Sequence, residues 1–111
     1  LNLLTTVRYT DFSRFSRAKN ILMTKPEITV RECETLEELA ECVQLQRDVF
    51  ALPEIEISPV RHLVVTKHAG GFTLGAFAGE KLVGFVLSVP AFLRGEPAFY
   101  SHMTAVAEDF Q

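Results

Sequence analysis

The chain has 111 residues, of which 48% are hydrophobic and 23% charged, and its net charge is −3. This length suits one domain with a single two-layer core, and the acidic balance argues against nucleic acid as the main partner. No apolar run approaches the roughly 20 residues of a membrane-spanning helix. We therefore expect no membrane partner and a cytoplasmic location.

Residues 1–25 differ in composition from the rest of the chain. They hold five basic side chains and one acidic side chain, whereas the remaining residues hold six basic and thirteen acidic ones. Two interpretations stay open: a basic, acid-poor targeting segment, or an upstream extension or disordered arm before a natural start at Met23. In either case we place the domain itself at residues 26–111.

The domain is predicted to begin with a strand and a capped helix. Residues 28–33 alternate between apolar and polar side chains, as a half-buried strand does. Thr35 and Glu38 have the spacing of a capping box. The helix that follows should end before Pro53, because proline disfavours helical backbone in the residue before it. The apolar stripe of this helix is predicted to be Leu36, Leu39, Ala40, Val43 and Phe50.

A second helix is predicted after a short linker at residues 55–57. Ser58 has the side chain of an N-cap, and Pro59 suits the first helical position, where its missing N–H costs nothing. Gly70 and Gly71 should end this helix. Its buried side is predicted to be Val60, Leu63 and Val64.

Three β-prone segments follow the helices. Residues 72–77 and 82–89 are separated by a short connector that contains Gly, which is typical of an antiparallel hairpin. Neither run alternates cleanly, so we expect both faces of these strands to be covered. After a bend at residues 90–97, residues 99–106 are predicted to form a third strand. The predicted fold class is therefore α+β, ordered as strand, helix, helix and then three antiparallel strands.

His102 is the most interesting polar side chain of the last strand. Period-two alternation predicts that it shares a face with Tyr100, Thr104 and Val106. If this face borders a cleft, His102 is suited to take a proton from an amine near neutral pH. The alternative is a histidine that is hydrogen-bonded within the sheet and takes part in no chemistry. Both interpretations stay open.

The remaining histidines and the cysteines do not predict a metal site. His62 and His68 are six residues apart on one helix, so about 240° separates them. Cys33 and Cys42 lack the close-spaced partners of a zinc site. We interpret these two cysteines as buried, reduced thiols, with a disulfide as the alternative.

The string GFTLGAFAGEKLVGF, followed by SHMTAVAEDF, resembles the central sheet of the GNAT superfamily of acyl-CoA N-acyltransferases. The resemblance runs from near Ile28 to Gln111, and it is to a poorly characterised branch with Ser-His-Met on the fourth strand. It implies an enzyme, an N-acetyltransferase that uses acetyl-CoA as co-substrate and a small-molecule or peptide amine as acceptor. The sequence does not identify that amine.

The resemblance also assigns site residues. In this family, main-chain N–H groups of the fourth strand hold the pantetheine arm of acetyl-CoA and polarise its thioester. This implies cofactor-binding positions at Thr104, Ala105 and Val106, although an ordinary buried strand fits the same letters. His102 is the candidate catalytic residue, in the role of base. Glu54 and Glu56 fall where the family's acceptor pocket lies; they either attract an amine or are solvated loop charges.

The sequence departs from the family pattern after this strand. The family often has Val-x-Pro-Glu-Tyr-Arg, where residues 106–111 read VAEDFQ, and its Gly-rich loop for the CoA pyrophosphate would come next. We therefore expect the chain as written to be a fragment, the N-terminal part of a GNAT fold. It should be inactive, with a millimolar-scale affinity for acetyl-CoA or none.

An open sheet edge also predicts a different class of function. A last strand without a neighbour exposes unpaired backbone groups along one side. The alternative to an enzyme is a non-catalytic α+β module that senses a ligand or binds a partner at this edge. Edge-to-edge pairing with a second copy of the chain is one such interaction.

Overall fold

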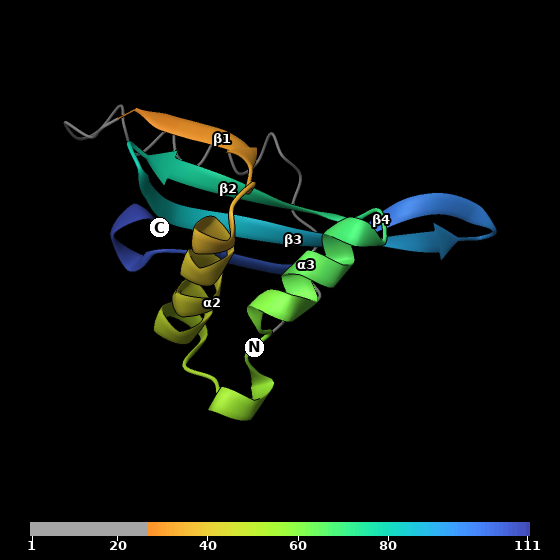
Figure 1. The fold of residues 1–111 in the computed structure, drawn as a ribbon, viewed down its shortest axis with the longest axis horizontal. Coiled ribbons are helices and arrows are strands. Elements are labelled where there is room, and N and C mark those ends of the chain that lie inside the picture. Colours follow the sequence, from red (N-terminus) through yellow and green to blue (C-terminus); the bar gives the residue numbers. More distant parts are fainter. Residues whose placement is uncertain (1–26) are drawn as a thin grey trace.

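The computed structural model describes residues 27–111, so the arm predicted at residues 1–25 lies outside the described residues. The four strands form one antiparallel sheet in the order β1-β2-β3-β4, and both α-helices cover the same face of it (Figure 1). The predicted α+β class and the predicted order of strands and helices are confirmed. The elements are β1 (Ile28–Glu32), α2 (Leu36–Phe50), η1 (Glu54–Glu56), α3 (Val60–His68), β2 (Phe72–Ala78), β3 (Lys81–Leu93), β4 (Glu96–Val106) and η2 (Glu108–Phe110).

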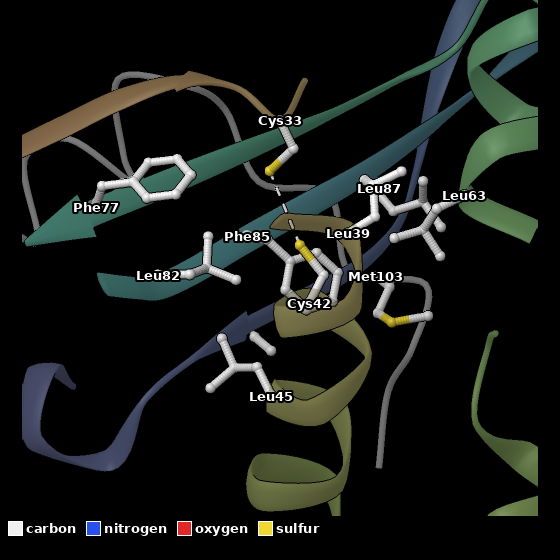
Figure 2. Packing of buried hydrophobic residues seen from close by; sticks show 11 residues of the cluster. Cys33, Leu39, Cys42, Leu45, Leu63, Phe77, Leu82, Phe85, Leu87 and Met103 are labelled. Carbon is white, nitrogen blue, oxygen red and sulfur yellow. Dashed lines mark hydrogen bonds between the residues drawn. The ribbon is translucent and has the colours of Figure 1, made fainter. Parts of the chain in front are cut away.

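The main core lies between the two helices and the sheet (Figure 2). Phe85 and Leu87 of β3 are fully buried at its centre. Burying a side chain of this size stabilises the fold by about 1.5–3 kcal/mol, so these central strand residues hold the helices in place. The other members of this core are Cys33, Leu39, Cys42, Leu45, Leu63, Phe77, Leu82, Met103 and Ala105.

A smaller apolar cluster lies on the opposite face of the sheet. It is built around Ala76 of β2 and Val83 of β3. Residues 82–88 of β3 are buried without interruption, because the sheet is covered on both faces at this point. The absence of clean alternation in β2 and β3 thus has the predicted cause. The cluster is completed by Ile28, Val30, Ala78, Val106, Ala107 and Phe110.

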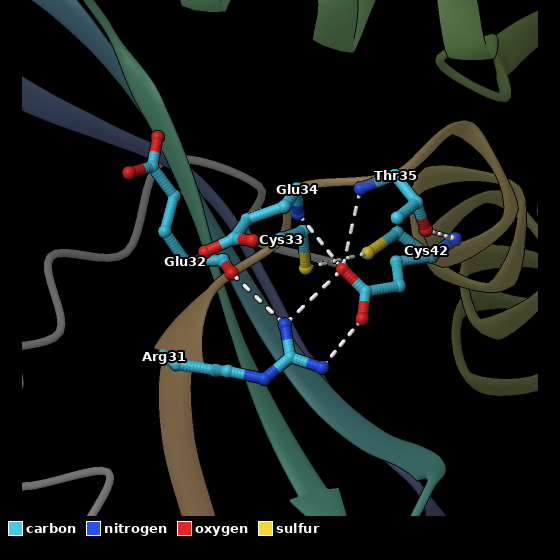
Figure 3. Close-up of polar contacts among 7 residues, drawn as sticks. Arg31, Glu32, Cys33, Glu34, Thr35 and Cys42 are labelled. Carbon is cyan, nitrogen blue, oxygen red and sulfur yellow. Dashed lines mark hydrogen bonds and ion pairs between the residues drawn. The ribbon is translucent and has the colours of Figure 1, made fainter.

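Helix α2 begins with the predicted capping box. The Thr35 hydroxyl accepts a hydrogen bond from the Glu38 N–H, and the Glu38 carboxylate accepts one from the Thr35 N–H (Figure 3). Glu38 also forms an ion pair with Arg31 of β1, which ties the start of the helix to the first strand. The helix ends at Phe50, with Ala51 in the left-handed conformation, as expected before Pro53.

The predicted buried stripe of α2 is partly wrong. Leu36 is 63% exposed, and Ala40 is also exposed. The face that contacts the sheet instead includes Cys42 and Gln46, which a count of large apolar residues does not include. Leaving them out rotated the predicted stripe around the helix axis. The buried residues of α2 are Leu39, Cys42, Val43, Leu45 and Gln46.

The predicted start of α3 is one residue too early. The helix begins at Val60, with Pro59 rather than Ser58 at the N-cap, and no side chain caps it. The backbone of Ser58 is occupied elsewhere, because the Gln46 side chain hydrogen-bonds both its N–H and its C=O. At the other end, Gly70 has a φ of +101° and terminates the helix as predicted.

The β3–β4 hairpin is longer than predicted, and the bend expected at residues 90–97 is wrong. Only Arg94 and Gly95 form the turn, and both have positive φ, as a two-residue hairpin connection requires. Pro90 stays within β3, opposite Phe99. Strand β2 begins opposite Ser88, so beyond that point β3 has β4 as its one strand neighbour. Proline is tolerated at this position because β3 is paired on one side only there, so the missing N–H does not interrupt pairing with strands on both sides.

Candidate functional site

Strand β4 contains a β-bulge at His102. Leu87 of β3 pairs with Met103, but the next residue, Ser88, pairs with Ser101. His102 is therefore an extra residue that faces no partner across the strand. A bulge of this kind bends the strand locally and redirects its side chains.

The bulge places His102 on the helix-covered face of the sheet. Its imidazole lies against His62 of α3, with ring centroids 5.8 Å apart and ring planes at 74°. Val106 instead packs in the cluster on the opposite face, and alternation puts Thr104 there too. The predicted face shared by His102, Thr104 and Val106 is therefore wrong, because the extra residue shifts the alternation by one. Tyr100, before the bulge, remains on the His102 side.

The surroundings of His102 favour its neutral form. The residue is half-buried, and burial lowers the pKa of its imidazole below the usual 6.5, with a further contribution from the charge of His62. A neutral imidazole at pH 7 is able to accept a proton. The position of His102 thus meets the first requirement for a general base.

Strand β4 has a strand neighbour on one side within the described residues, so its other side is an edge of the sheet. The Ala107 N–H donates to the Val83 carbonyl at 2.8 Å. Because successive residues of a strand direct their backbone groups to opposite sides, the N–H groups of Thr104 and Val106 point to the open edge, and that of Ala105 points to β3. In agreement, the Val106 carbonyl accepts a hydrogen bond from the Gln111 side chain at 2.7 Å.

Two hydroxyl groups next to the bulge are buried without hydrogen-bond partners among the described residues. They are Ser101 Oγ and Thr104 Oγ1. Ser101 is only 7% exposed. A buried polar group left unpaired costs about 1–3 kcal/mol, so these two hydroxyls are a local cost to the fold.

The other candidate groups lie elsewhere. Glu54 forms an ion pair with Arg47, whereas Glu56 is exposed. Cys33 and Cys42 are free, buried thiols with their sulfurs 3.9 Å apart, which agrees with the reduced pair that the sequence predicts. Residues 27–111 contain no group of three or more His, Cys, Asp or Glu placed to hold a metal ion. No helix in this range is long and apolar enough to cross a membrane.

No protein-family model matches the sequence, and no curated protein matches it. A solved structure does match: the GCN5-related glucosamine N-acetyltransferase region of the fungal multi-domain GH3 beta-N-acetylglucosaminidase. The match covers 78% of this chain with a TM-score of 0.60 and 15% sequence identity. The chain has a GNAT-like fold. It spans 10% of the length of that protein, and at this identity the likeness is one of fold.

Within the GNAT-like fold, all four residues predicted for the site lie on one strand. His102 stands at the bulge, and residues 104–106 follow it along the open edge. Their roles remain predictions. Sequence reasoning missed His62, which lies 40 positions before His102. The available signal was weak: His62 adjoins the buried Leu63 in the first turn of α3, at the margin of the buried side.

Proposed function

We propose that this domain serves the transfer of an acetyl group from acetyl-CoA to a primary amine. The observation that carries the proposal is that a bulged histidine and an open backbone edge occur together on β4. The GNAT-like fold supports the reaction class. The acceptor is a small-molecule or peptide amine, and the reaction is expected to take place in the cytoplasm.

Acetyl-CoA supplies the activated thioester of this reaction. The outward-pointing N–H groups of Thr104 and Val106 are placed to hydrogen-bond the pantetheine arm along the edge of β4, as an added strand would. His102 takes the proton of the attacking amine, since its imidazole is held neutral.

Binding is tested with S-acetylpantetheine, which carries the thioester and the amides but not the pyrophosphate. At millimolar concentration it should shift the amide NMR resonances of Thr104 and Val106. The matched control is the other sheet edge, where the outward-pointing amides of Val30 and Glu32 on β1 should not move. Equal shifts at both edges, or none at either, would count against the proposed site.

The role of His102 is tested by His102→Gln in a longer chain that carries a pyrophosphate-binding loop, assayed by release of CoA thiol with a panel of primary amines. Acid–base catalysis by one side chain typically contributes about 10²–10⁴-fold, so turnover should fall by this order. The loss should be largest above the pKa of the imidazole, where the wild type holds the neutral base. A variant that turns over like the wild type at every pH removes His102 from the mechanism.

A second candidate function is partner binding through the β3–β4 hairpin. The tip of this hairpin exposes large apolar side chains, with Phe92 78% and Leu93 67% accessible, and residues 97–106 contain no charged side chain at neutral pH apart from titratable His102. Exposed apolar edges of this kind favour pairing with another chain. We propose edge-to-edge pairing of two copies as the form this takes. Sedimentation velocity should then show a dimer that Phe92→Asp dissociates, and a monomeric wild type would refute it.

A further inference from the structure

We propose that His62 is a positioning residue that acts on the imidazole of His102 through the contact between their two rings. This inference rests on the proposed function, in which His102 accepts the proton of the amine. It begins from an arrangement that the sequence did not suggest. Two histidines from different elements lie ring against ring, with their centroids 5.8 Å apart.

The position of His62 is fixed by the elements on either side of it. Its neighbour Leu63 is 1% exposed and anchors the first turn of α3 in the main core. The segment that leads into the helix is held by the two hydrogen bonds between Gln46 and Ser58. His102 is brought to the same point by the bulge. The contact therefore does not depend on a mobile side chain at a free surface.

The charged groups around the pair do not favour two protonated rings. Two imidazolium groups at this separation repel each other, and burial strengthens the repulsion. The first turn of α3 carries no acidic residue that would offset this repulsion.

No other described element brings a free carboxylate to His102. Across the sheet lie Leu87 and Ser88 of β3, which are uncharged, and Tyr100 lies on the same side of β4. Among the described residues, His62 is the titratable group that acts on the charge of His102. The Glu54 carboxylate, in the linker before α3, is paired with Arg47.

This arrangement affects both halves of a catalytic cycle. In the forward step, an N–H bond of the amine breaks and a new N–H bond forms on the His102 imidazole. The nitrogen electron pair forms a bond to the acyl carbon, and the sulfur leaves as a thiolate. His102 then carries a positive charge beside His62. Repulsion from any proton on His62 favours loss of the His102 proton to water, which restores the base.

The test is an NMR titration of the three histidine side chains, followed through their Cε1–H resonances. His62→Gln should move the titration midpoint of His102 to higher pH. Because burial is the larger cause of the lowered value, the midpoint of His102 should stay below the ordinary histidine value in His62→Gln. The matched control is His68→Gln, an exposed histidine in the last turn of the same helix, which should leave the His102 midpoint unchanged.

A second variant guards against loss of folding in the first. His62→Lys places a lasting positive charge at the same position and should move the His102 midpoint to lower pH, opposite to the effect of His62→Gln. Folding of each variant is checked by the methyl resonances of Leu63 and Met103. If the His102 midpoint is the same in wild type, His62→Gln and His62→Lys, the inference is wrong.

The outcome is separable from that of the proposed function. If the histidines titrate as a coupled pair but no acetyl transfer is found, the proposed function fails and the pairing stands. If transfer is found, His62→Gln should shift the acidic limb of the pH–rate profile to higher pH, with KM for the amine little changed. Transfer with an unshifted acidic limb and uncoupled titrations would overturn the role of His62 alone.

Discussion

The side-chain amide of Gln46 forms both of its hydrogen bonds with the backbone of Ser58. Its Nε2 donates to the Ser58 carbonyl at 2.9 Å, and its Oε1 accepts from the Ser58 N–H at 2.8 Å. Gln46 is 1% exposed, so these two hydrogen bonds are shielded from water. The chain leaving α2 is thereby fixed four residues before His62, on the side of the core where the two histidines meet.

Gln46→Leu should lower the free energy of unfolding by about 2–3 kcal/mol, because two buried backbone groups lose their partners. Urea unfolding measures this change. The matched control is Gln44→Leu on the same helix, where the amide is exposed and bonds Asp48. An exposed substitution of this kind should change stability by about 0.5 kcal/mol at most. Equal effects of the two substitutions would contradict this account of Gln46.

Glu38 makes stability depend on pH in the acidic range. Hydrogen bonds from Arg31 and from backbone N–H groups lower the pKa of this carboxyl from 4.5 to about 2. Because the folded-state pKa is depressed, the stabilisation is fully present above the unfolded value and is lost as pH falls from about 4.5 through about 2. Glu38→Gln keeps an acceptor for the backbone but loses the charge.

The wild type should therefore exceed Glu38→Gln in stability at pH 7, by about 1 kcal/mol at most, since Arg31 is 42% exposed and water screens the pair. The difference should disappear near pH 2. Denaturant unfolding of both proteins at a series of pH values measures it. A difference that is constant from pH 7 to pH 2 would show that the charge of Glu38 has no part in it.

Gly75 lies where the core leaves no room for a side chain. A Cβ at this position would come within 2.8 Å of Cys33 Sγ, Leu82 Cδ1 and Phe77 Cε2. Gly75→Ala should therefore destabilise the fold by about 1–3 kcal/mol through overpacking. Introduced into a Cys33→Ala background, the same substitution should cost less, because one of the three contacts is gone. Additive effects in this double-mutant cycle would exclude the Cys33 contact as a cause.

The two thiols should be unreactive in the folded protein. Cys33 and Cys42 are both buried, and the pKa of Cys42 is raised, first by its hydrogen bond with Cys33 and then by burial. Since the thiolate is the reactive species, Ellman's reagent should detect almost no thiol in the native state and both thiols in denaturant. Rapid reaction of the native protein would contradict this burial of the pair.

Local signals in the sequence predicted much of the fold. The capping box at Thr35 and Glu38 and the end of α3 at Gly70 are set by residues close in sequence, and both are confirmed. The errors arose where distant contacts decide. Gln46 is buried because Ser58 supplies a partner for it, and Pro90 stays in a strand because β2 does not extend past Ser88.

The candidate site was predictable in its strand but not in its geometry. The resemblance marked residues 102–106, and these residues do lie along one open edge. The bulge was not predictable in this way. Strict alternation puts His102 on the same face as Thr104 and Val106, which in fact lie on the opposite face of the sheet. Met103 packs beneath the helices while Phe99 contacts Phe72 on the far face, and one extra residue between them reconciles the two. The extra residue can be recognised only once the pairing of β3 with β4 is known.

The bulge at His102 shows which residues of β4 are needed for backbone pairing with β3. Remove His102 from the strand, and Ser101 would be joined directly to Met103, opposite Ser88 and Leu87, which are already consecutive. The ladder would close without a gap, and each remaining side chain would keep the face it has now. Backbone pairing would therefore survive the deletion of this position. Strand β4 is one residue longer than its pairing requires, and the surplus residue is the histidine.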